Sequence, residues 1–589
     1  MISIANENIL HSGKVHCTLQ NTKTGDTKKK MNDYLRFALT GITVVFCVSC
    51  AKQGMPPGGP EDRKPPRVMQ TLPEPNAVHV PRNQKIQLTF DENIQSSSGD
   101  AVFISPYIEG DIKYKWKGKK LLLELPDSLQ SNTTYVITLG TSIKDYQNNA
   151  LKDSYTLAFS TGDSLDQGML FGQVLNLDDA KGIDVWAYHL MPDSACNPCE
   201  TAPDYIVQCS QKGEFRFSHI AAGTYRLFAV RDRVSNRLYD SGEDPVGISA
   251  KDIVLSKENH FRYGPVFLQM VLQDTTGPRL LAAVPVHGTQ YLLRFDEAIE
   301  LTDSCLILRR SLTDSTQMSV ISQYYLEEES PKVVHVIDPV MTPGQYLIQV
   351  HNISDLNHNT MTSANAIEFE ASAEEDTTKP ALLRIQPKAG QRNVHPDSCL
   401  SLVFSEPMDT TDFAKFVALT DTAGNPADCS PEWKNCARLD FCPSTSWTGL
   451  KLYEVTIEDS GLSDLSGNML PDSTFLFTII NPDTLSEISG TIERDDRFPP
   501  ARVVLTATSV TRLVRCYRIT VPKGETQFLF KKLMPGQYVL QAFLDLNDDE
   551  TFTYGAVWPY QPAEPCYALP DTITARSRWP NEGNQFILK

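Results

Sequence analysis

The amino-acid sequence predicts an all-β fold, arranged as a tandem array of β-sandwiches. Two phrases of sequence recur along the 589 residues, which is typical of proteins assembled from repeated modules. Apolar and polar residues alternate in short runs between turn residues, the pattern of half-buried strands. No convincing long run at helical spacing follows the N-terminal segment. The length allows about four to six domains of roughly 100–150 residues each.

The first phrase occurs twice, and every matched pair of residues is offset by 313 positions. It joins a Phe-x-Phe strand, a Gly-x-Tyr-x-Leu-x-Ala strand and a following aspartate. Its members are Phe215, Phe217, Gly223, Tyr225, Leu227, Ala229 and Asp232 in one copy, and Phe528, Phe530, Gly536, Tyr538, Leu540, Ala542 and Asp545 in the other. The copies predict two modules of one fold, which we name the second module (166–271) and the fifth module (485–589).

The second phrase occurs three times. A Phe-x-Glu ends a strand, a tyrosine opens an alternating strand, and Asp-x-x-x-Asn forms a turn, because these side chains bond their own backbone and tolerate left-handed φ. The members are Phe90, Glu92, Tyr135, Asp145 and Asn149; Phe295, Glu297, Tyr346, Asp355 and Asn359; and Phe404, Glu406, Tyr453, Asp464 and Asn468. They predict the first module (65–163), a degenerate third module (274–373) and the fourth module (376–483).

The N-terminal 50 residues form a predicted export signal. Three lysines and Arg36 precede an apolar run over residues 37–48. This run is shorter than the roughly 20 residues that span a bilayer, and fits a signal-peptide core. It ends in Val-Ser-Cys50, which resembles a bacterial lipobox, although Cys47 stands where leucine is usual. Met31 would start a signal of ordinary length. The alternative to a cleaved signal is an uncleaved anchor or a chance apolar patch.

The resemblance to a lipobox implies that Cys50 is lipidated and becomes the mature N-terminus. Residues 51–64 then form a tether, because proline stiffens the chain and glycine prevents regular structure. The mature protein is expected in the cell envelope as an outer-membrane lipoprotein, facing either the periplasm or the surface. The net charge of −18 argues against a nucleic-acid partner, whose phosphates require a basic surface.

Two families resemble the modules. Phe-Asp-Glu at 90–92 and 295–297, Phe-Ser-Glu-Pro-Met at 404–408 and the Asp-x-x-x-Asn turns resemble the SbsA-type bacterial Ig-like domain of exported Bacteroidota lipoproteins. The other module type looks like the prealbumin-like or carboxypeptidase-regulatory-like sandwich. Leu-Met-Pro-Gly-Gln-Tyr538 resembles a tyrosine corner, in which the hydroxyl bonds upstream backbone. The resemblance implies immunoglobulin-like and prealbumin-like sandwiches, the latter generally non-catalytic.

Catalysis has little support in the sequence. Glu92, Glu297 and Glu406 could act as paired carboxylates with Asp91 or Asp296. However, adjacent carboxylates on a strand point to opposite faces, so polar strand ends are the preferred interpretation. No Gly-x-Ser-x-Gly, His-Glu-x-x-His or phosphate-binding loop occurs. A site made by dispersed residues stays open.

Two segments could bind metal. Asp545, Asn547 and Asp549 place oxygen ligands at alternate positions, as in the opening of a calcium loop. The rest of an EF-hand is missing, and a solvated turn is the alternative. His351, Asp355 and His358 could form a metal cluster in the third module. No other cofactor is expected.

The cysteines suggest disulfides. Of 13 cysteines, ten remain once Cys17, Cys47 and Cys50 are set aside, an even number in an exported chain. The fourth module holds four, with three connectivities open. The candidates are Cys196, Cys199, Cys399, Cys429, Cys436, Cys442, Cys516 and Cys566. For the Cys196-x-x-Cys199 pair we expect a structural disulfide rather than redox or zinc chemistry.

Trp558, Tyr560 and Trp579 form a candidate binding platform near the C-terminus, with burial in a core as the alternative. Taken together, the sequence predicts a lipid-anchored, non-catalytic envelope protein that serves as a stalk, scaffold or adhesion-type binding protein. Its partners would be the membrane, through the lipid, and an unidentified envelope protein or glycan. The alternative is a component of a surface glycan-processing system with a dispersed catalytic or carbohydrate-binding site.

Overall fold

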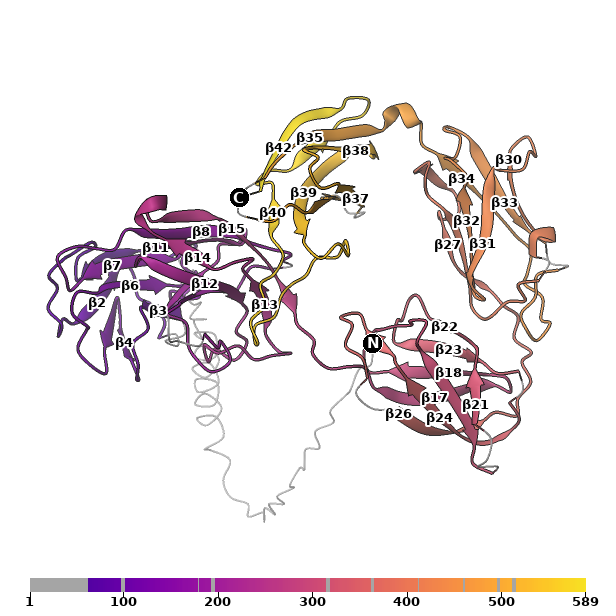
Figure 1. The fold of residues 1–589 in the computed structure, drawn as a ribbon, viewed down its shortest axis with the longest axis horizontal. Coiled ribbons are helices and arrows are strands. Elements are labelled where there is room, and N and C mark those ends of the chain that lie inside the picture. Colours follow the sequence, from indigo (N-terminus) through magenta and orange to yellow (C-terminus); the bar gives the residue numbers. More distant parts are fainter. Residues whose placement is uncertain are drawn as a thin grey trace, which may run out of the picture. The chain divides into compact units, whose positions relative to one another are not determined.

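The computed structural model describes residues 62–588, apart from short gaps at 97–100, 178, 192–195, 314–317, 340, 362–364, 412, 459–460, 495–497 and 511–514. Cys50, the export signal and most of the tether therefore lie outside the described residues. Regular structure in the described part is strand, apart from short 3₁₀ turns. Figure 1 shows the strands gathered into successive modules from indigo to yellow. The prediction of an all-β tandem array of β-sandwiches is confirmed.

The first module consists of two sheets around one core. One sheet has the order β1 (Val68–Leu72), β2 (Ile86–Phe90), β5 (Lys120–Glu124), β4 (Lys113–Lys117). The other has the order β3 (Val102–Ser105), β6 (Thr134–Leu139), β7 (Tyr155–Ser160). Along β2, Ile86, Leu88 and Phe90 are buried while the residues between them are not, so the alternation places one face in the core.

The third module is built from two four-stranded sheets and a short strand pair. The first sheet is β17 (Leu280–His287), β18 (Gln290–Phe295), β23 (Val333–Ile337), β22 (Gln323–Leu326). The second is β21 (Met318–Ile321), β20 (Leu306–Ser311), β24 (Gly344–His351), β26 (Asn365–Ala371). The pair is β19 (Ile299–Glu300) with β25 (Ser354–Asp355), which carries the Asp-x-x-x-Asn turn.

The fourth module has two four-stranded sheets. They are β27 (Leu382–Gln386), β29 (Leu400–Phe404), β32 (Arg438–Pro443), β31 (Cys429–Asn435), and β28 (Gln391–Val394), β34 (Ser473–Ile479), β33 (Leu452–Ile457), β30 (Val417–Asp421). The short turn η3 (Phe413–Lys415) lies between β29 and β30, and η4 (Pro482–Thr484) follows β34. As in β2, alternate residues of β29 are buried in the core.

The second and fifth modules share one topology. In the second module, one sheet has the order β11 (Glu214–Ile220), β8 (Gly168–Leu175), β15 (Arg262–Gln269). The facing sheet has the order β10 (Tyr205–Gln208), β9 (Asp184–His189), β12 (Gly223–Val230), β13 (Pro245–Ile248), β16 (Val271–Leu272), and β14 (Ile253–Leu255) also pairs with β12. The short turn η2 (Lys257–Asn259) precedes β15. In the fifth module, one sheet has the order β38 (Gln527–Leu533), β35 (Ser486–Arg494), β42 (Asn581–Leu588). The facing sheet has the order β37 (Cys516–Val521), β36 (Arg502–Ser509), β39 (Gly536–Asp545), β40 (Cys566–Ala568), and β41 (Ile573–Ala575) also pairs with β39.

Both copies pair their first and last strands in parallel, β8 with β15 and β35 with β42. A glycine on the first strand permits this close approach. A Cβ at Gly172 would lie 1.9 Å from the Val266 carbonyl oxygen, and a Cβ at Gly490 would lie 1.9 Å from that of Asn584.

The predicted tyrosine corner is present. The Tyr538 hydroxyl donates to the Met534 carbonyl at 2.6 Å, and Tyr225 bonds the Ala221 carbonyl in the same way at 3.0 Å. Tyr346 repeats the bond to its own upstream backbone at Thr342, at 2.9 Å. The motif therefore ties a sheet crossover in both module types. Among the described residues, no helix has the length and apolar character needed to cross a membrane.

Candidate functional site

The structure gathers three carboxylates at the start of the first, third and fourth modules; in the first they are Asp62, Glu92 and Asp145. Asp274, Glu297 and Asp355 each offer an oxygen within 4.8 Å of the others, and Asp376, Glu406 and Asp464 do the same. The glutamate follows the strand that ends in Phe295 or Phe404. The two aspartates come from the segment before the first strand and from the Asp-x-x-x-Asn turn. Residues from three separate segments thus meet in one place in each module.

The turn aspartate is held rigidly. In the third module, Asp355 is buried and accepts the backbone N–H groups of Asn357 and Asn359, both at 2.8 Å. The Asn359 amide donates to Asp355 at 2.8 Å and to the Asp274 carbonyl at 2.8 Å, which fixes the incoming segment against the turn.

The fourth module repeats this arrangement. Asn468 donates its side-chain amide to Asp464 at 2.8 Å and to the Asp376 carbonyl at 3.2 Å. The Asp-x-x-x-Asn motif therefore has a structural role beyond its own turn, since it secures the segment that leads into each of these modules.

The central glutamates are the groups most affected electrostatically. Burial, followed by the nearby Asp274 and Asp355 carboxylates, raises the pKa of Glu297 to about 7. Burial, followed by Asp376 and Asp464, raises the pKa of Glu406 to about 7 as well. Below that pH a protonated glutamate can donate a hydrogen bond to the neighbouring aspartate. Above it, a hard cation that prefers oxygen ligands would offset the repulsion between the carboxylates.

The residues beside these glutamates point elsewhere. Asp91 accepts the Arg67 N–H at 2.8 Å, and Asp296 accepts the Arg279 N–H at 2.8 Å. Ser405 accepts the Ala381 N–H at 2.9 Å. The polar residue after the phenylalanine therefore satisfies backbone where the first strand has an irregular register. This geometry matches the interpretation of the Phe-Asp-Glu motif as a polar strand end.

Asp274 and Asp376 are not among the candidate site residues predicted from the sequence. The signal was present in the parallel segments Asp-Thr-Thr-Gly-Pro278 and Asp-Thr-Thr-Lys-Pro380. Their meaning depended on knowing that these segments fold back beside the turn. The proposed cluster with two histidines is replaced by this one, because Asp355 groups with Asp274 and Glu297. His358 instead is exposed and lies 3.6 Å from Glu300.

The Asp545 loop contains its own positive charge. Asp545 is fully buried, and Arg502 Nη2 donates to its carboxylate at 2.8 Å. Arg502 also lies 3.0 Å from Asp548 and 3.3 Å from Glu550. The Asn547 amide donates to Asp549 at 2.8 Å. A calcium ion at Asp545, Asn547 and Asp549 stays a prediction, and it would have to share Asp545 with the guanidinium.

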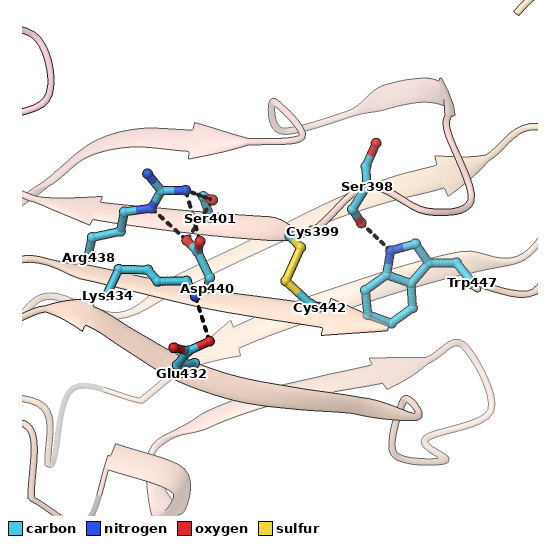
Figure 2. Close-up of a disulfide and its surroundings, with 9 residues drawn as sticks. All are labelled: Ser398, Cys399, Ser401, Glu432, Lys434, Arg438, Asp440, Cys442 and Trp447. Atoms are coloured by element: carbon cyan, nitrogen blue, oxygen red, sulfur yellow. Dashed lines mark hydrogen bonds and ion pairs between the residues drawn. A yellow bond between two sulfur atoms is a disulfide. The ribbon is translucent and has the colours of Figure 1, made fainter. Parts of the chain in front are cut away.

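One disulfide joins residues of the fourth module, Cys399 and Cys442, whose Cα atoms lie 4.2 Å apart (Figure 2). Leu400 pairs with Phe441, so the two cysteines stand opposite one another on adjacent strands. Trp447 donates to the Ser398 carbonyl at 2.6 Å beside it. Figure 2 also shows Arg438 bound to Asp440 on the same strand, with Nε–Oδ1 and Nη2–Oδ2 distances of 2.8 Å.

The remaining disulfide candidates are free thiols, which corrects the prediction for them: Cys196, Cys199, Cys429, Cys436, Cys516 and Cys566. Cys516 and Cys566 lie on β37 and β40, at opposite edges of a sheet, too far apart to bond. Cys436 lies in the turn between β31 and β32, at the opposite end of β32 from Cys442.

The expected disulfide between Cys196 and Cys199 is likewise not formed. Both side chains pack against an apolar cluster of the second module. Burial raises the pKa of the Cys196 thiol to about 11. A thiol in this state is a poor nucleophile and a poor metal ligand, which also argues against redox or zinc chemistry at this pair.

Two of the three residues of the candidate aromatic platform are exposed, and the third is half-buried. Trp558 and Trp579 are 52% and 71% exposed, respectively, and stay available to a ligand. Tyr560 is half-buried, with its ring 6.2 Å from that of Phe228 in an edge-to-face contact. Tyr560 therefore does not belong to an open surface.

Comparisons with known proteins agree with the fold. The family described as the bacterial Ig-like domain matches residues 62–161 and 376–479. The chain thus contains bacterial Ig-like domains within its array of β-sandwiches. No curated protein sequence matches the chain.

Parts of the chain match solved structures at low sequence identity. Chicken CNTN1 FN1–FN3 domains are 10% identical, cover 51% of this chain and 98% of their own, and have a TM-score of 0.13. The N-terminal part of the bacterial S-layer protein SbsC is 12% identical, over 34% of this chain and 44% of its own, with a TM-score of 0.15. Mycobacterium tuberculosis L,D-transpeptidase 1 is 10% identical, over 35% and 99%, with a TM-score of 0.16. At these scores none of them indicates an activity for this chain.

Proposed function

We propose that this chain is a lipid-anchored, non-catalytic protein of the outer membrane that serves as a stalk, scaffold or adhesion-type binding protein. The observation that carries the proposal is the array of β-sandwich modules, two of them matched by the bacterial Ig-like domain. It is supported by the sequence of the N-terminal segment, which predicts an export signal ending in Val-Ser-Cys50. Such an array holds binding surfaces at a distance from an anchor. Ig-like domains are also widely used in non-catalytic surface proteins.

The geometry of the conspicuous carboxylates supports a mechanical role. Asp355 and Asp464 fix the segment that leads into each module, and the glutamates between the aspartates sit on the same join. Polar side chains used to hold consecutive modules together suit a stalk better than a reaction centre. No calcium is required by this function, and the Asp545 loop is a separate question.

The test of the anchor is metabolic labelling with a fatty-acid analogue. The wild-type chain and Cys47→Ala should carry the label and fractionate with the outer membrane, whereas Cys50→Ala should lose both properties. Cys47 is the matched control, because it lies three residues before Cys50 in the same apolar run. Equal labelling of wild type and Cys50→Ala would contradict the proposal.

A second candidate is glycan binding by the fifth module, as a carbohydrate-binding part of a surface glycan-processing system. The exposed Trp558 and Trp579 favour it, since sugar rings stack on such side chains. Retention of the chain on an envelope-polysaccharide column should then fall for Trp579→Ala. Unchanged retention of Trp558→Ala and Trp579→Ala together would exclude this role for the two tryptophans.

A further inference from the structure

The second module has an unusual sheet, because its middle strand is buried on both faces. In β12, Tyr225, Leu227 and Ala229 belong to the core of the module. Phe228 and Val230 point the other way and belong to a separate apolar cluster. Neighbouring strands extend this second surface, which we call the outer face: Trp186, Tyr188, Phe228, Val230, Val246 and Ile248. A surface of this kind would be unstable if water covered it.

The described residues of the fifth module form no such face, although the module has the same topology. The register of β36 with β39 places Thr506 opposite Gln541, where the second module has Trp186 opposite Phe228. Thr508 likewise stands where the second module has Tyr188. Polar residues have replaced the aromatic ones at equivalent positions. The apolar outer face is therefore not a requirement of the fold.

The fifth module carries an insertion that the second module lacks. Val230 pairs with Val246, sixteen positions further on, whereas the equivalent Phe543 pairs with Cys566, twenty-three positions further on. The extra seven residues lie between Gly555 and Glu564 and include Trp558 and Tyr560. One carboxylate holds this loop in each module, Asp244 in the second and Glu564 in the fifth.

Asp244 in the second module and Glu564 in the fifth have the same partners. Asp244 accepts the N–H groups of Arg233 at 3.0 Å and Asp240 at 3.1 Å. Glu564 accepts those of Leu546 at 2.6 Å and Thr553 at 3.0 Å, and each donor is offset by 313 residues from its counterpart. The inserted residues are thus an addition to a conserved frame within the chain, and not a different loop.

The insertion packs on the outer face of the second module. Val557 and Ala563 belong to the same buried cluster as Phe228 and Val230, and Phe103 of the first module covers part of the same face. Arg226 lies over the Tyr560 ring, with its Cζ 3.5 Å from the ring centroid. Two hydrogen bonds of 2.8 Å to Asp252 hold the guanidinium in place. A cation in this position is attracted by the aromatic quadrupole.

Polar contacts surround this apolar centre. The Gln273 amide donates to the Gly555 carbonyl at 2.8 Å, and the Gln269 amide donates to the Tyr554 hydroxyl at 3.2 Å. The Tyr560 hydroxyl donates to the Ser249 carbonyl at 3.4 Å. An apolar centre inside a polar rim is the usual anatomy of a specific interface.

We propose that residues 552–567, the docking arm, clasp the fifth module to the outer face of the second module within one chain. The two copies of the repeated fold then act as one unit, although more than two hundred residues separate them in sequence. The arm also removes the outer face from the surface that outside partners can reach. Its occupant is this chain itself, because the insertion and the apolar face each occur in only one of the two copies, and each fits the other.

Hydrogen exchange measured by mass spectrometry on the full chain tests the clasp. Tyr560→Ala should speed exchange of β12 and β13 in the second module about tenfold, which corresponds to about 1.4 kcal/mol. Trp558→Ala, in the same insertion but exposed, should leave the second module unchanged. Faster exchange confined to residues 545–568 of the fifth module in Tyr560→Ala would overturn the proposal.

The reciprocal variant is Phe228→Gln, which introduces the residue found at the equivalent position of the fifth module. It should speed exchange of the docking arm by a similar factor, and an unchanged arm would overturn the proposal. If Phe228→Gln unfolds the second module, Tyr560→Ala decides the matter alone, because Tyr560 lies outside the core of its own module. Light scattering should give the mass of a monomer for wild type; a dimer that Tyr560→Ala dissociates would overturn docking within one chain.

Discussion

The second and fifth modules start from the same phrase of sequence and differ in what surrounds it. Both bury the Phe-x-Phe and Tyr-x-Leu-x-Ala side chains in a single core, and both close a tyrosine corner. The difference lies on the outside. Arg502 neutralises Asp545 in the fifth module, whereas the equivalent Asp232 in the second accepts backbone N–H groups of its own loop, from Ser235 and Arg237. The comparison teaches that the repeated phrase specifies the sandwich, while residues outside it specify what each copy contacts.

Removing one core leucine should affect both copies alike. Leu227→Ala in the second module and Leu540→Ala in the fifth each leave a cavity at a fully buried position. We expect each to lower the free energy of unfolding of its module by about 2–5 kcal/mol. Calorimetry of the full chain, with the exposed Leu529→Ala as control, measures this. If the free energy of unfolding fell in one module without a comparable fall in the other, the two cores would not be equivalent.

Removing Arg502 should affect the fifth module alone. Arg502→Met leaves the fully buried Asp545 carboxylate without its cationic partner. Breaking a buried pair costs about 3–5 kcal/mol, and we expect the lower end because Arg502 is 27% exposed. A loss below about 0.5 kcal/mol for Arg502→Met, the level of an ordinary surface substitution, would contradict this account of the loop.

A change of pH should affect the stability of the second module more than that of the fifth, the reverse of the effect expected for Arg502→Met. Burial, with Asp232 as the next cause, raises the pKa of Asp184 in the second module to about 7, and the fifth module has Val504 at this place. The folded state then holds a proton that the unfolded chain releases near pH 4. The stability of the second module should therefore fall between about pH 4 and 7, by at most about 1.4 kcal/mol per pH unit.

Asp184→Asn should remove that slope. The measurement is the free energy of unfolding of the second module in urea at pH 5 and at pH 8, monitored by hydrogen exchange of that module. An unchanged slope in the variant would show that another group is responsible.

Calcium should give the smallest effect, and only in the fifth module. Asp545, Asn547 and Asp549 offer oxygens, whereas Val234 replaces the middle position in the second module. Because Arg502 competes for Asp545, we expect calcium to raise the melting temperature of Arg502→Met more than that of wild type. Saturation at 100 times Kd would add about 2.7 kcal/mol. No shift in either protein at millimolar calcium, relative to chelator, would leave the loop as a polar turn.

Much of the fold followed from periodicity. Ile86, Leu88 and Phe90 alternate with polar residues, and such a pattern determines which face of a strand is buried without reference to any distant residue. The carboxylate clusters did not follow, because Asp274 reaches Glu297 only after the segment folds back. The pairing of Cys399 with Cys442 required the register of β29 with β32.

The outer face of the second module could not be predicted from the sequence for a related reason. Phe228 and Val230 interrupt the alternation of β12, and a strand with two apolar faces is explained only by what covers its second face. The covering residues lie in an insertion of the fifth module and, for Phe103, in the first module. No local pattern in the second module could identify them.

A double-mutant cycle between Phe228 and Tyr560 tests the central claim most directly, that the two copies differ on the outside because one docks on the other. The free energy of unfolding is measured for the full chain, for Phe228→Ala, for Tyr560→Ala and for the double variant. Direct packing across the clasp predicts a coupling energy of about 0.5–1.5 kcal/mol, typical of an aromatic pair. Additive effects, within about 0.3 kcal/mol, would mean that the two rings do not act on one another and would contradict the account.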